Sequence, residues 1–317
     1  MKHSKKIEKI YQDIKDLNVQ SATNVAIATF EGMKEASNFE NHKSESFINH
    51  ILDVGEYLAY ARPNEPLAQN GVLYIRYLFN KRGGYRFPIE EEKQLIRELC
   101  DDFLDKIEDD KKNILKRNVP NLQQVDHVLT HCHSSTAVNL IKGIAQNDDD
   151  FTAVCTETRP RYQGRKTAKE LVKSGINTTL IADSAAESFV IGRGSKSVSE
   201  VFIGCDAITM NGYCINKIGS WGIAMAAHQA GKPLYVVTPL LKIDHDSAYH
   251  SIKIEVREDE ELWTEAPKGL EMYNPAFEVV DSGLITGFIT EFGILKPEEI
   301  GNMVRKEFPW LFLKKSI

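Results

Sequence analysis

One sulfhydryl group is a first candidate for proton-transfer chemistry. Cys132 lies between an expected strand, 125–130, and an expected helix that begins near Ser135. A thiol at the N-terminus of a helix has a lowered pKa, because unpaired N–H groups and the helix dipole favour the thiolate. His131 and His133 would lower that pKa further if they were cationic. The competing interpretation is a small buried hydrophobic residue, as most free cysteines are, and position alone favours neither.

A carboxyl group is the second candidate. Asp206 comes three residues after the end of residues 201–203, which read as a buried strand. An acid in a partly desolvated pocket can hold a proton at neutral pH and serve as general acid or base. The alternative is an ordinary turn or N-cap aspartate, and a single Asp at a strand end favours that alternative when taken alone.

Two segments have the composition of an anion-binding site. Residues 156–165 contain three arginines, several hydroxyl groups and a glycine before an expected helix, which suits a phosphate held by Arg side chains and helix N–H groups. The alternative is a solvated loop whose arginines pair with Asp and Glu. Residues 211–219 place Asn216 and Lys217 before another expected helix. Neither segment matches a Walker loop or the dinucleotide fingerprint, so no nucleotide cofactor is indicated.

Two further features allow a functional and an ordinary interpretation. Neighbouring residues at a strand end point to opposite faces, so residues 131–133 cannot easily converge on one ion, and no second Cys/His cluster has zinc spacing. We therefore expect no metal site. Arg62 lies in a turn with two prolines at 61–66, where it could reach the edge of a sheet, although such an arginine is more often a surface loop residue.

The elements that must position these residues differ between the two halves of the chain. Residues 1–120 have the apolar periodicity of helices, including a long charged helix over 89–117. After Pro120, β-branched runs at 125–130, 151–156, 178–182, 201–203 and 234–237 alternate with helical segments at 137–146, 166–173 and 219–230. This alternation predicts an α/β fold, with a helical domain over 1–120 and a parallel-sheet domain over 121–317. Polar clusters follow each strand, at the edge where such sheets bind ligands.

Composition excludes several classes of protein. The chain has 317 residues, with 39 Lys and Arg against 45 Asp and Glu, a net charge of −6, which argues against non-specific nucleic-acid binding. No run approaches the length of a membrane span. The charged N-terminus lacks the apolar core of a signal peptide, so we expect a cytoplasmic protein. Five cysteines at irregular spacing are too few for a disulfide framework.

Taken together, the motifs resemble one superfamily, the aldose-ketose isomerases and regulatory factors related to initiation factor 2B. The resemblance covers nearly the whole chain and implies a helical N-terminal domain followed by a Rossmann-like parallel-sheet domain. Its most specific parts are Glu157-Thr158-Arg159-Pro160 with Gln163-Gly164, then Gly204-Cys205-Asp206, and then Asn211-Gly212 with Asn216-Lys217-Ile218-Gly219.

Three branches of that superfamily compete. The regulatory subunits of translation initiation factor 2B usually lack the catalytic Cys and Asp, whereas this chain has Cys132 and Asp206. Methylthioribose-1-phosphate isomerases usually carry Cys-Asn-Ala-Gly at the first position. Here residues 132–135 read Cys-His-Ser-Ser, which looks like the archaeal ribose-1,5-bisphosphate isomerases of nucleoside monophosphate (AMP) breakdown. The leading expectation is that activity, with the other two branches as alternatives.

The resemblance also implies residue roles. It makes Cys132 and Asp206 the catalytic pair. Our hypothesis is that Asp206 donates a proton to the ring oxygen and the Cys132 thiolate removes the C2 proton, and a hydride shift is the alternative that the sequence leaves open. The expected substrate-binding residues are Gln20, Ser21, Arg62, Ser134, Ser135, Arg159, Gln163, Arg165, Asn216 and Lys217. One departure is that Gln20-Ser21 stands where these isomerases often have Arg-Gly, which removes a charge.

The resemblance bears on partners as well. It implies a phosphorylated pentose as substrate and no metal or redox cofactor. A homodimer or hexamer is expected, without nucleic-acid or membrane partners. AMP activates enzymes of this branch, but no residue in the sequence can be assigned to it.

Overall fold

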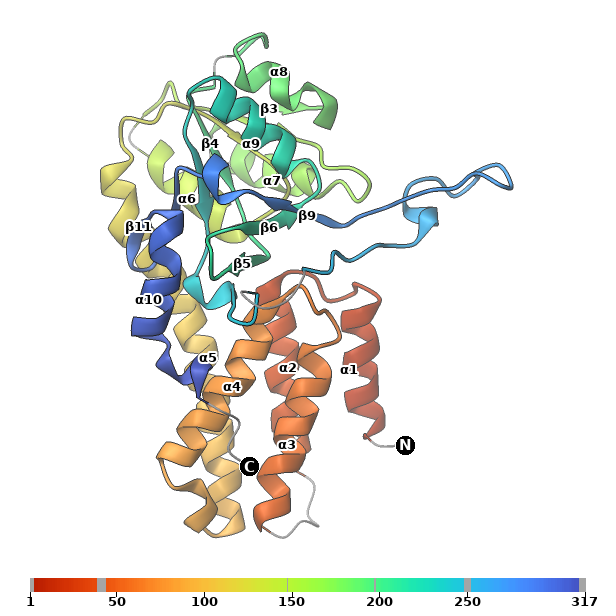
Figure 1. Cartoon of the computed structure of the whole chain (residues 1–317), viewed down its shortest axis with the longest axis vertical. Helices are drawn as coiled ribbons and strands as arrows, with labels where there is room; N and C mark the ends of the chain where they lie inside the picture. Colours follow the sequence, from red (N-terminus) through yellow and green to blue (C-terminus); the bar gives the residue numbers. More distant parts are fainter. Residues whose placement is uncertain (1–2, 39–43, 147, 197, 248–251, 314–317) are drawn as a thin grey trace. The chain divides into compact units, whose positions relative to one another are not determined.

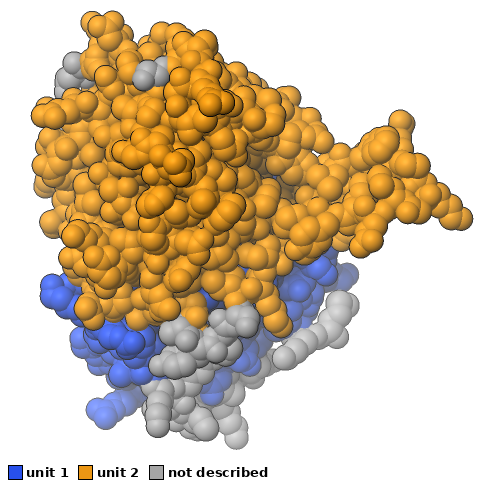
Figure 2. Space-filling model, turned by 45° about the horizontal axis from the view of Figure 1, so that its top comes forward, with its two compact units in different colours: residues 1–109, 241–245, 304–317 blue, residues 110–240, 246–303 orange. Residues whose placement is uncertain are grey.

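The structure is a computed structural model that describes residues 3–38, 44–146, 148–196, 198–247 and 252–313 (Figure 1). The chain forms two compact units (Figure 2). Unit 1 holds Met1–Asp109, Leu241–His245 and Val304–Ile317, and unit 2 holds Asp110–Leu240 and Asp246–Met303. No helix of the described residues has the length and apolar character needed to cross a membrane.

Unit 1 is built from helices. They are α1 (Lys5–Lys15), α2 (Ala22–Ala36), α3 (Ser44–Ala59), α4 (Pro66–Lys81) and most of α5 (Ile89–Asn118). In the core, the rings of Phe30 on α2 and Phe103 on α5 meet edge to face with centroids 5.2 Å apart. Gly71 on α4 faces both rings, and a Cβ at this position would lie 2.4 Å from Phe30 and 2.5 Å from Phe103. Glycine is therefore required for this packing.

A short segment far along the sequence belongs to the same unit. The buried Asn70 amide on α4 donates hydrogen bonds to the carbonyls of Leu241 (2.8 Å) and Ile243 (2.7 Å). The second carbonyl begins β8 (Ile243–Asp244). These bonds satisfy backbone groups that would otherwise be buried without partners.

Unit 2 contains a seven-stranded sheet in the order β11-β10-β7-β4-β1-β2-β3. Its strands are β1 (His127–Thr130), β2 (Thr152–Thr156), β3 (Asn177–Ile181), β4 (Glu200–Ile203), β7 (Leu234–Val237), β10 (Gly287–Thr290) and β11 (Gly293–Leu295). All neighbours pair in parallel except β10 with β11. The predicted α/β fold with a parallel sheet is confirmed, and the five predicted strands lie within two residues of their expected positions.

The strand order creates a switch point between β1 and β4. From β1 the chain runs through α6 (Ser135–Ala145) to β2, and through α7 (Gln163–Lys173) to β3. It then passes α8 (Ala186–Val190) to β4, and continues through α9 (Ser220–Gln229) to β7 on the other side. Because crossovers are right-handed, α6 and α7 cover one face of the sheet and α9 covers the other. Ligands of such sheets bind where the direction reverses.

A smaller antiparallel sheet was not predicted. It contains β5 (Ala207–Thr209), β6 (Cys214–Lys217) and β9 (Phe277–Val280), with β6 paired to both neighbours. Asn216 and Lys217 therefore lie on a strand, directly opposite Glu278 and Phe277 of β9. The strands are three or four residues long, which is too short for a period-two pattern to be recognised. The last helix is α10 (Ile300–Glu307).

Candidate active site

The two candidate catalytic residues follow neighbouring strands. Cys132 comes two residues after β1 and Asp206 three residues after β4, and β1 pairs directly with β4. The charge of Asp206 raises the pKa of both Cys132 and Lys217, and Arg257 also acts on both groups. Unit 2 thus brings Cys132, Asp206, Lys217 and Arg257 into one electrostatic cluster at the switch point.

Lys217 is the buried cation of this cluster. The residue is only 4% exposed, and its Nζ lies 4.9 Å from the centroid of the Phe277 ring. Burial lowers the pKa of Lys217, while the nearby acidic groups Cys132, Asp206 and Glu255 oppose that decrease. Within the described residues, no carboxylate forms an ion pair with its ammonium group. Lys217 therefore has its positive charge available for an anionic ligand.

The thiol is protonated in this environment. Burial raises the pKa of Cys132 to about 11, with a further increase from the charge of Asp206. The charges of Lys217 and Arg257 and the backbone N–H of His133 act in the opposite direction but do not compensate. The expectation of a lowered thiol pKa is therefore wrong. Desolvation outweighs the helix dipole, whose effect is confined to the first turn.

The two flanking histidines are neutral. Burial lowers the pKa of His131, and lowers that of His133 to about 4. The possibility that they are cationic and stabilise a thiolate is therefore excluded. His131 bonds to Thr156 and to the Ile218 carbonyl, whereas His133 Nδ1 lies 3.0 Å from Thr167 Oγ1 on α7.

The loop after β2 is held against the end of the sheet. Asp183, which follows β3, accepts hydrogen bonds from the backbone N–H groups of Thr158 (2.7 Å) and Arg159 (2.6 Å). A Cβ on Gly164 would lie 1.8 Å from the carbonyl oxygen of Thr156, so only glycine allows α7 to begin here. Asp183 was not among the predicted binding residues, although its place at a strand end was a usable signal.

The arginines of this loop already have protein partners. Arg165 donates to Glu157 (2.8 Å) and its guanidinium lies 3.7 Å from the ring centroid of Tyr162. Arg159 donates to the Tyr162 hydroxyl and to the Leu262 carbonyl (3.2 Å). Such protein partners are typical of the alternative interpretation, in which residues 156–165 form a solvated loop. Phosphate binding by Arg159 and Arg165 stays a prediction.

Gln163 differs from the arginines beside it. Its side-chain oxygen Oε1 is buried and has no hydrogen-bond partner among the residues that the structure describes. A buried acceptor without a partner is costly, and a ligand hydroxyl or a water molecule would satisfy it. This observation supports the predicted role of Gln163 in substrate binding.

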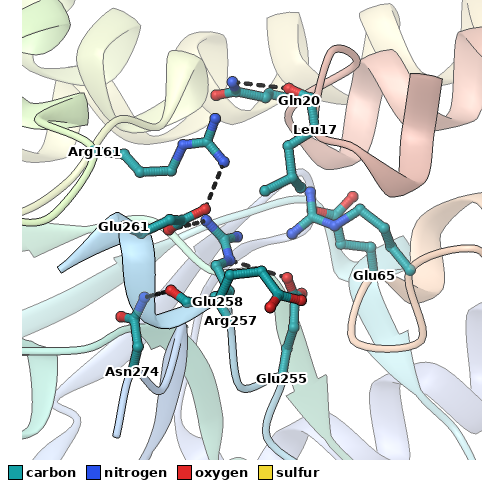
Figure 3. A network of polar contacts seen from close by, with 10 residues as sticks. Leu17, Gln20, Glu65, Arg161, Glu255, Arg257, Glu258, Glu261 and Asn274 are labelled. Atoms are coloured by element: carbon teal, nitrogen blue, oxygen red, sulfur yellow. Dashed lines mark hydrogen bonds and ion pairs between the residues drawn. The ribbon is translucent and has the colours of Figure 1, made fainter. Parts of the chain in front are cut away.

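An ion-pair ladder extends from the same loop (Figure 3). Arg161 Nη1 lies 3.0 Å from Glu261, and Glu261 lies 3.8 Å from Arg257 Nη1. Arg257 Nε in turn lies 3.0 Å from Glu255. Sequence reasoning missed Arg257 and Glu255, because they lie in a long connection with no periodic pattern. The ladder places the charge of Arg257 where it acts on the thiol.

The N-terminus of α9 is occupied by a carboxylate. Glu278 on β9 accepts hydrogen bonds from the N–H groups of Gly219 (2.6 Å) and Trp221 (2.8 Å). Burial raises the pKa of Glu278 and these N–H groups oppose the increase. The Asn216 amide donates to Ser220 Oγ at 2.9 Å. These bonds hold the turn that follows Lys217, and a carboxylate of the protein occupies the helix end at which a phosphate could otherwise bind.

The other predicted residues of unit 2 lie at the start of α6. Ser134 is its N-cap, and its hydroxyl accepts from the Ala137 N–H at 3.3 Å. Ser135 is exposed in the first turn. Gly204 lies against Ser134, because a Cβ on this glycine would be 2.5 Å from the serine Cβ. The β4 end that leads to Asp206 is therefore packed on the segment that follows Cys132.

Three predicted residues belong to unit 1. The Gln20 amide donates to the Leu17 carbonyl at 3.0 Å (Figure 3), and Ser21 caps α2 by accepting from the Asn24 N–H at 3.4 Å. Arg62 is buried and its Nη1 lies 2.5 Å from Glu65. Their contact with substrate stays a prediction.

Comparison with known proteins places this geometry in a family. The initiation factor 2 subunit family matches residues 18–297. The chain belongs to this family. It is 33% identical over 309 residues to the ribose 1,5-bisphosphate isomerase of Methanocaldococcus jannaschii, covering 96% of each chain. It is 35% identical over 315 residues to the 5-deoxyribose 1-phosphate isomerase of Petrotoga mobilis, covering 91% of this chain and 86% of that one.

A solved structure of the family has the same fold. The 5-methylthioribose 1-phosphate isomerase of Pyrococcus horikoshii superposes with a TM-score of 0.74 at 27% identity. The match covers 96% of this chain and 87% of that chain. The family resemblance that the sequence motifs indicated is therefore confirmed, and so is the expected fold.

Proposed function

We propose that this chain is a sugar-phosphate isomerase that converts ribose 1,5-bisphosphate to ribulose 1,5-bisphosphate. The enzyme class is confirmed by relatives across nearly the whole chain that are named sugar-phosphate isomerases. The observation that carries the proposal is the meeting of Cys132 and Asp206, beyond the ends of the paired strands β1 and β4, in one electrostatic cluster with the buried Lys217. The Cys-His-Ser-Ser sequence at 132–135 supports the bisphosphate as substrate.

The reaction needs one acid and one base. A phosphate on C1 locks the sugar as a furanose, so the enzyme must protonate the ring oxygen as the ring opens. It must then take the proton from C2, which gives an enol phosphate, and return a proton to C1. The C2 hydroxyl releases its proton to water as the ketone forms, and the acid regains a proton from water. Two groups whose environments differ in proton affinity are sufficient for these steps.

The resting charges favour a particular division of labour. The Cys132 thiol is protonated at neutral pH, and Asp206 acts on its neighbours as a negative charge. We assign proton donation to the ring oxygen to Cys132, and removal of the C2 proton to Asp206. This order is the reverse of the one expected from sequence.

The available groups suit an anionic sugar. The unpaired ammonium of Lys217 would hold a phosphate, and the free Oε1 of Gln163 would accept a sugar hydroxyl. Proposed further contacts come from the remaining predicted residues, Gln20, Ser21, Arg62, Ser134, Ser135, Arg159, Arg165 and Asn216. The arginines would have to exchange a protein partner for phosphate.

A substrate panel tests the proposal. Purified protein is incubated separately with ribose 1,5-bisphosphate, 5-deoxyribose 1-phosphate and methylthioribose 1-phosphate, and ketose formation is followed by NMR. We expect kcat/KM for the bisphosphate to exceed the others by at least tenfold. A preference for either monophosphate would overturn the substrate assignment. No turnover of any sugar would favour the alternative of a non-catalytic regulatory subunit.

Deuterium exchange tests the two roles. With ribulose 1,5-bisphosphate in D₂O, the base alone is needed to exchange a C1 proton, because the ketose chain is already open. We expect Cys132→Ser to keep this exchange and Asp206→Asn to lose it. The opposite result would restore the order expected from sequence, and absence of exchange in the unmodified protein would indicate a hydride shift.

The wider role and assembly are also proposals. We propose that the product feeds nucleoside monophosphate breakdown in the cytoplasm, that AMP activates the enzyme, and that it forms a homodimer or hexamer. Initial rates with and without AMP test the activation, and light scattering of the purified protein tests the assembly.

A further inference from the structure

Cys132 has an unusual backbone conformation. Its φ is +68°, in the left-handed region that few residues other than glycine adopt. Such a conformation persists only where the surroundings impose it. Both backbone polar groups of Cys132 are held by threonine hydroxyls. Its N–H donates to Thr158 Oγ1 at 3.0 Å, and its carbonyl accepts from Thr167 Oγ1 at 2.8 Å.

The first of these bonds begins a chain of hydrogen bonds. Thr158 Oγ1 lies 3.2 Å from Thr156 Oγ1, and Thr156 Oγ1 lies 2.7 Å from His131 Nδ1. His131 Nε2 lies 2.8 Å from the carbonyl oxygen of Ile218. The chain therefore joins the residue after β1 to the end of β2 and to the turn after β6.

The four hydrogen bonds all run in one direction, from donor to acceptor. The Ile218 carbonyl can only accept, so His131 carries its proton on Nε2, and Nδ1 of the neutral ring accepts from the Thr156 hydroxyl. Thr156 then accepts from the Thr158 hydroxyl, and Thr158 accepts from the Cys132 N–H. Every hydroxyl both donates and accepts, so the four bonds are mutually consistent.

The residues of this hydrogen-bond chain are buried and closely packed, so their side chains have little room to move. Thr156 and Thr158 are fully buried, and His131 is 2% exposed. Gly219 has a φ of +104°, and a Cβ on it would lie 3.1 Å from two atoms of the His131 ring. Ile218 directly follows Lys217, so the same bonds link the segment of the thiol to the segment of the buried cation.

We propose that His131, Thr156 and Thr158 are positioning residues, whose directed hydrogen-bond chain holds Cys132 in its left-handed conformation and keeps the thiol facing Lys217 and Asp206. This inference rests on the proposed function for its consequence in turnover. The thiol itself reports on the hydrogen-bond chain without any sugar, so the two proposals can fail separately.

Alkylation of the thiol tests the inference directly. The rate of carbamidomethylation of Cys132 by iodoacetamide is measured against pH by peptide mass, since the other four cysteines are buried. In Thr158→Val the backbone relaxes and the thiol turns toward water. We expect the midpoint of the alkylation rate against pH, which is about 11 in the unmodified protein, to fall by at least one pH unit. Alkylation at pH 8 should become at least tenfold faster. Thr158→Ser keeps the hydroxyl and should match the unmodified protein.

Two controls separate positioning from general stability. Thr29→Val removes a hydroxyl of equal burial that bonds only within α2, to Val25. It should lower the melting temperature without moving the alkylation profile. Thr156→Val is a second variant should Thr158→Val not fold, and should shift the profile in the same direction. Because the hydrogen-bond chain acts as a unit, combining Thr156→Val with Thr158→Val should shift the alkylation profile no further than the larger of the two single changes.

Turnover provides the second readout. With ribose 1,5-bisphosphate we expect Thr158→Val to lower kcat at least tenfold while KM stays within twofold, and Thr158→Ser to restore kcat. An unchanged alkylation profile in Thr158→Val and Thr156→Val, with only a loss of stability, would overturn the inference. Absence of turnover in the unmodified protein would instead overturn the proposed function and leave the alkylation result standing.

Discussion

At the scale of single residues, protonation in this site is decided by burial and by partners from distant strands. Cys132 has two histidine neighbours and a following helix, yet burial raises the pKa of its thiol to about 11. Asp206 and Lys217 act on it with opposite signs. The chemical character of the thiol thus comes from groups more than 70 residues away in sequence.

The catalytic assignment predicts a large loss of turnover from small changes. Cys132→Ser and Asp206→Asn should each lower kcat by at least about two orders of magnitude, because each removes a proton-transfer group. The measurement is the rate of ketose formation on folded protein, checked by circular dichroism. Cys100→Ala, at a buried thiol on α5, is the matched control and should keep kcat. Near-normal turnover in either variant removes that residue from the mechanism.

Lys217 gives a prediction with a definite sign. Its positive charge lowers the pKa of Cys132, so Lys217→Met should raise that pKa above about 11 and slow alkylation at any fixed pH below it. Lys217→Arg keeps the charge and should leave the profile close to normal. KM for the sugar phosphate should rise in Lys217→Met. Faster alkylation in Lys217→Met would contradict the described electrostatics.

At the scale of elements, α7 shows how glycine serves two different purposes. Gly164 stands in its first turn because a side chain would strike the Thr156 carbonyl at 1.8 Å. Gly175 follows its end with a φ of +82° and open space around the Cβ position. The first glycine is required by packing at the end of β2, and the second only by backbone conformation.

Substitution at the two glycines should therefore differ in cost. Gly175→Ala should lower the free energy of unfolding by about 1 kcal/mol, the cost of a left-handed alanine. Gly164→Ala should lower it by about 3 kcal/mol or more, because α7 must move away from β2. Urea unfolding measures both values. Equal losses at the two positions would show that the close approach at Gly164 does not constrain the fold.

At the scale of the whole molecule, buried histidines link folding to pH. His131 and His133 have lowered pKa values in the folded chain, and that of His133 is about 4. The unfolded chain has an ordinary histidine pKa of about 6.5, so it binds more protons as pH falls below that value. Stability is therefore complete above about pH 6.5 and decreases toward pH 4.

This linkage predicts a measurable difference. The full shift of His133 corresponds to roughly 3 kcal/mol, and partial exposure reduces the expected loss between pH 7 and pH 4 to about 2 kcal/mol. His133→Asn keeps a donor near Thr167 but cannot titrate, so its unfolding free energy should vary less with pH. Denaturant unfolding at several pH values gives the comparison. Identical pH dependence in the two proteins would contradict the assigned burial of His133.

Local pattern alone determined the helical half, five strands of the large sheet and the reactive groups of this protein. Apolar periodicity located α5 and the five strands from β1 to β7 that were predicted, because helix and strand periods depend only on nearby residues. Residue types at strand ends identified Cys132 and Asp206 as candidates, and the segment before an expected helix identified Lys217. The motifs also identified the initiation factor 2 family, which the match over residues 18–297 confirms.

Tertiary structure decided what these groups can do. The adjacency of β1 and β4, the small sheet that carries Lys217, and the effect of Arg257 on the thiol all depend on contacts between distant segments. The thiol pKa could not be predicted because desolvation is a property of the packed site, whereas the helix dipole is visible in the local sequence. Long-range packing sets strand order and burial, and those two quantities brought the acid–base pair together and set its protonation.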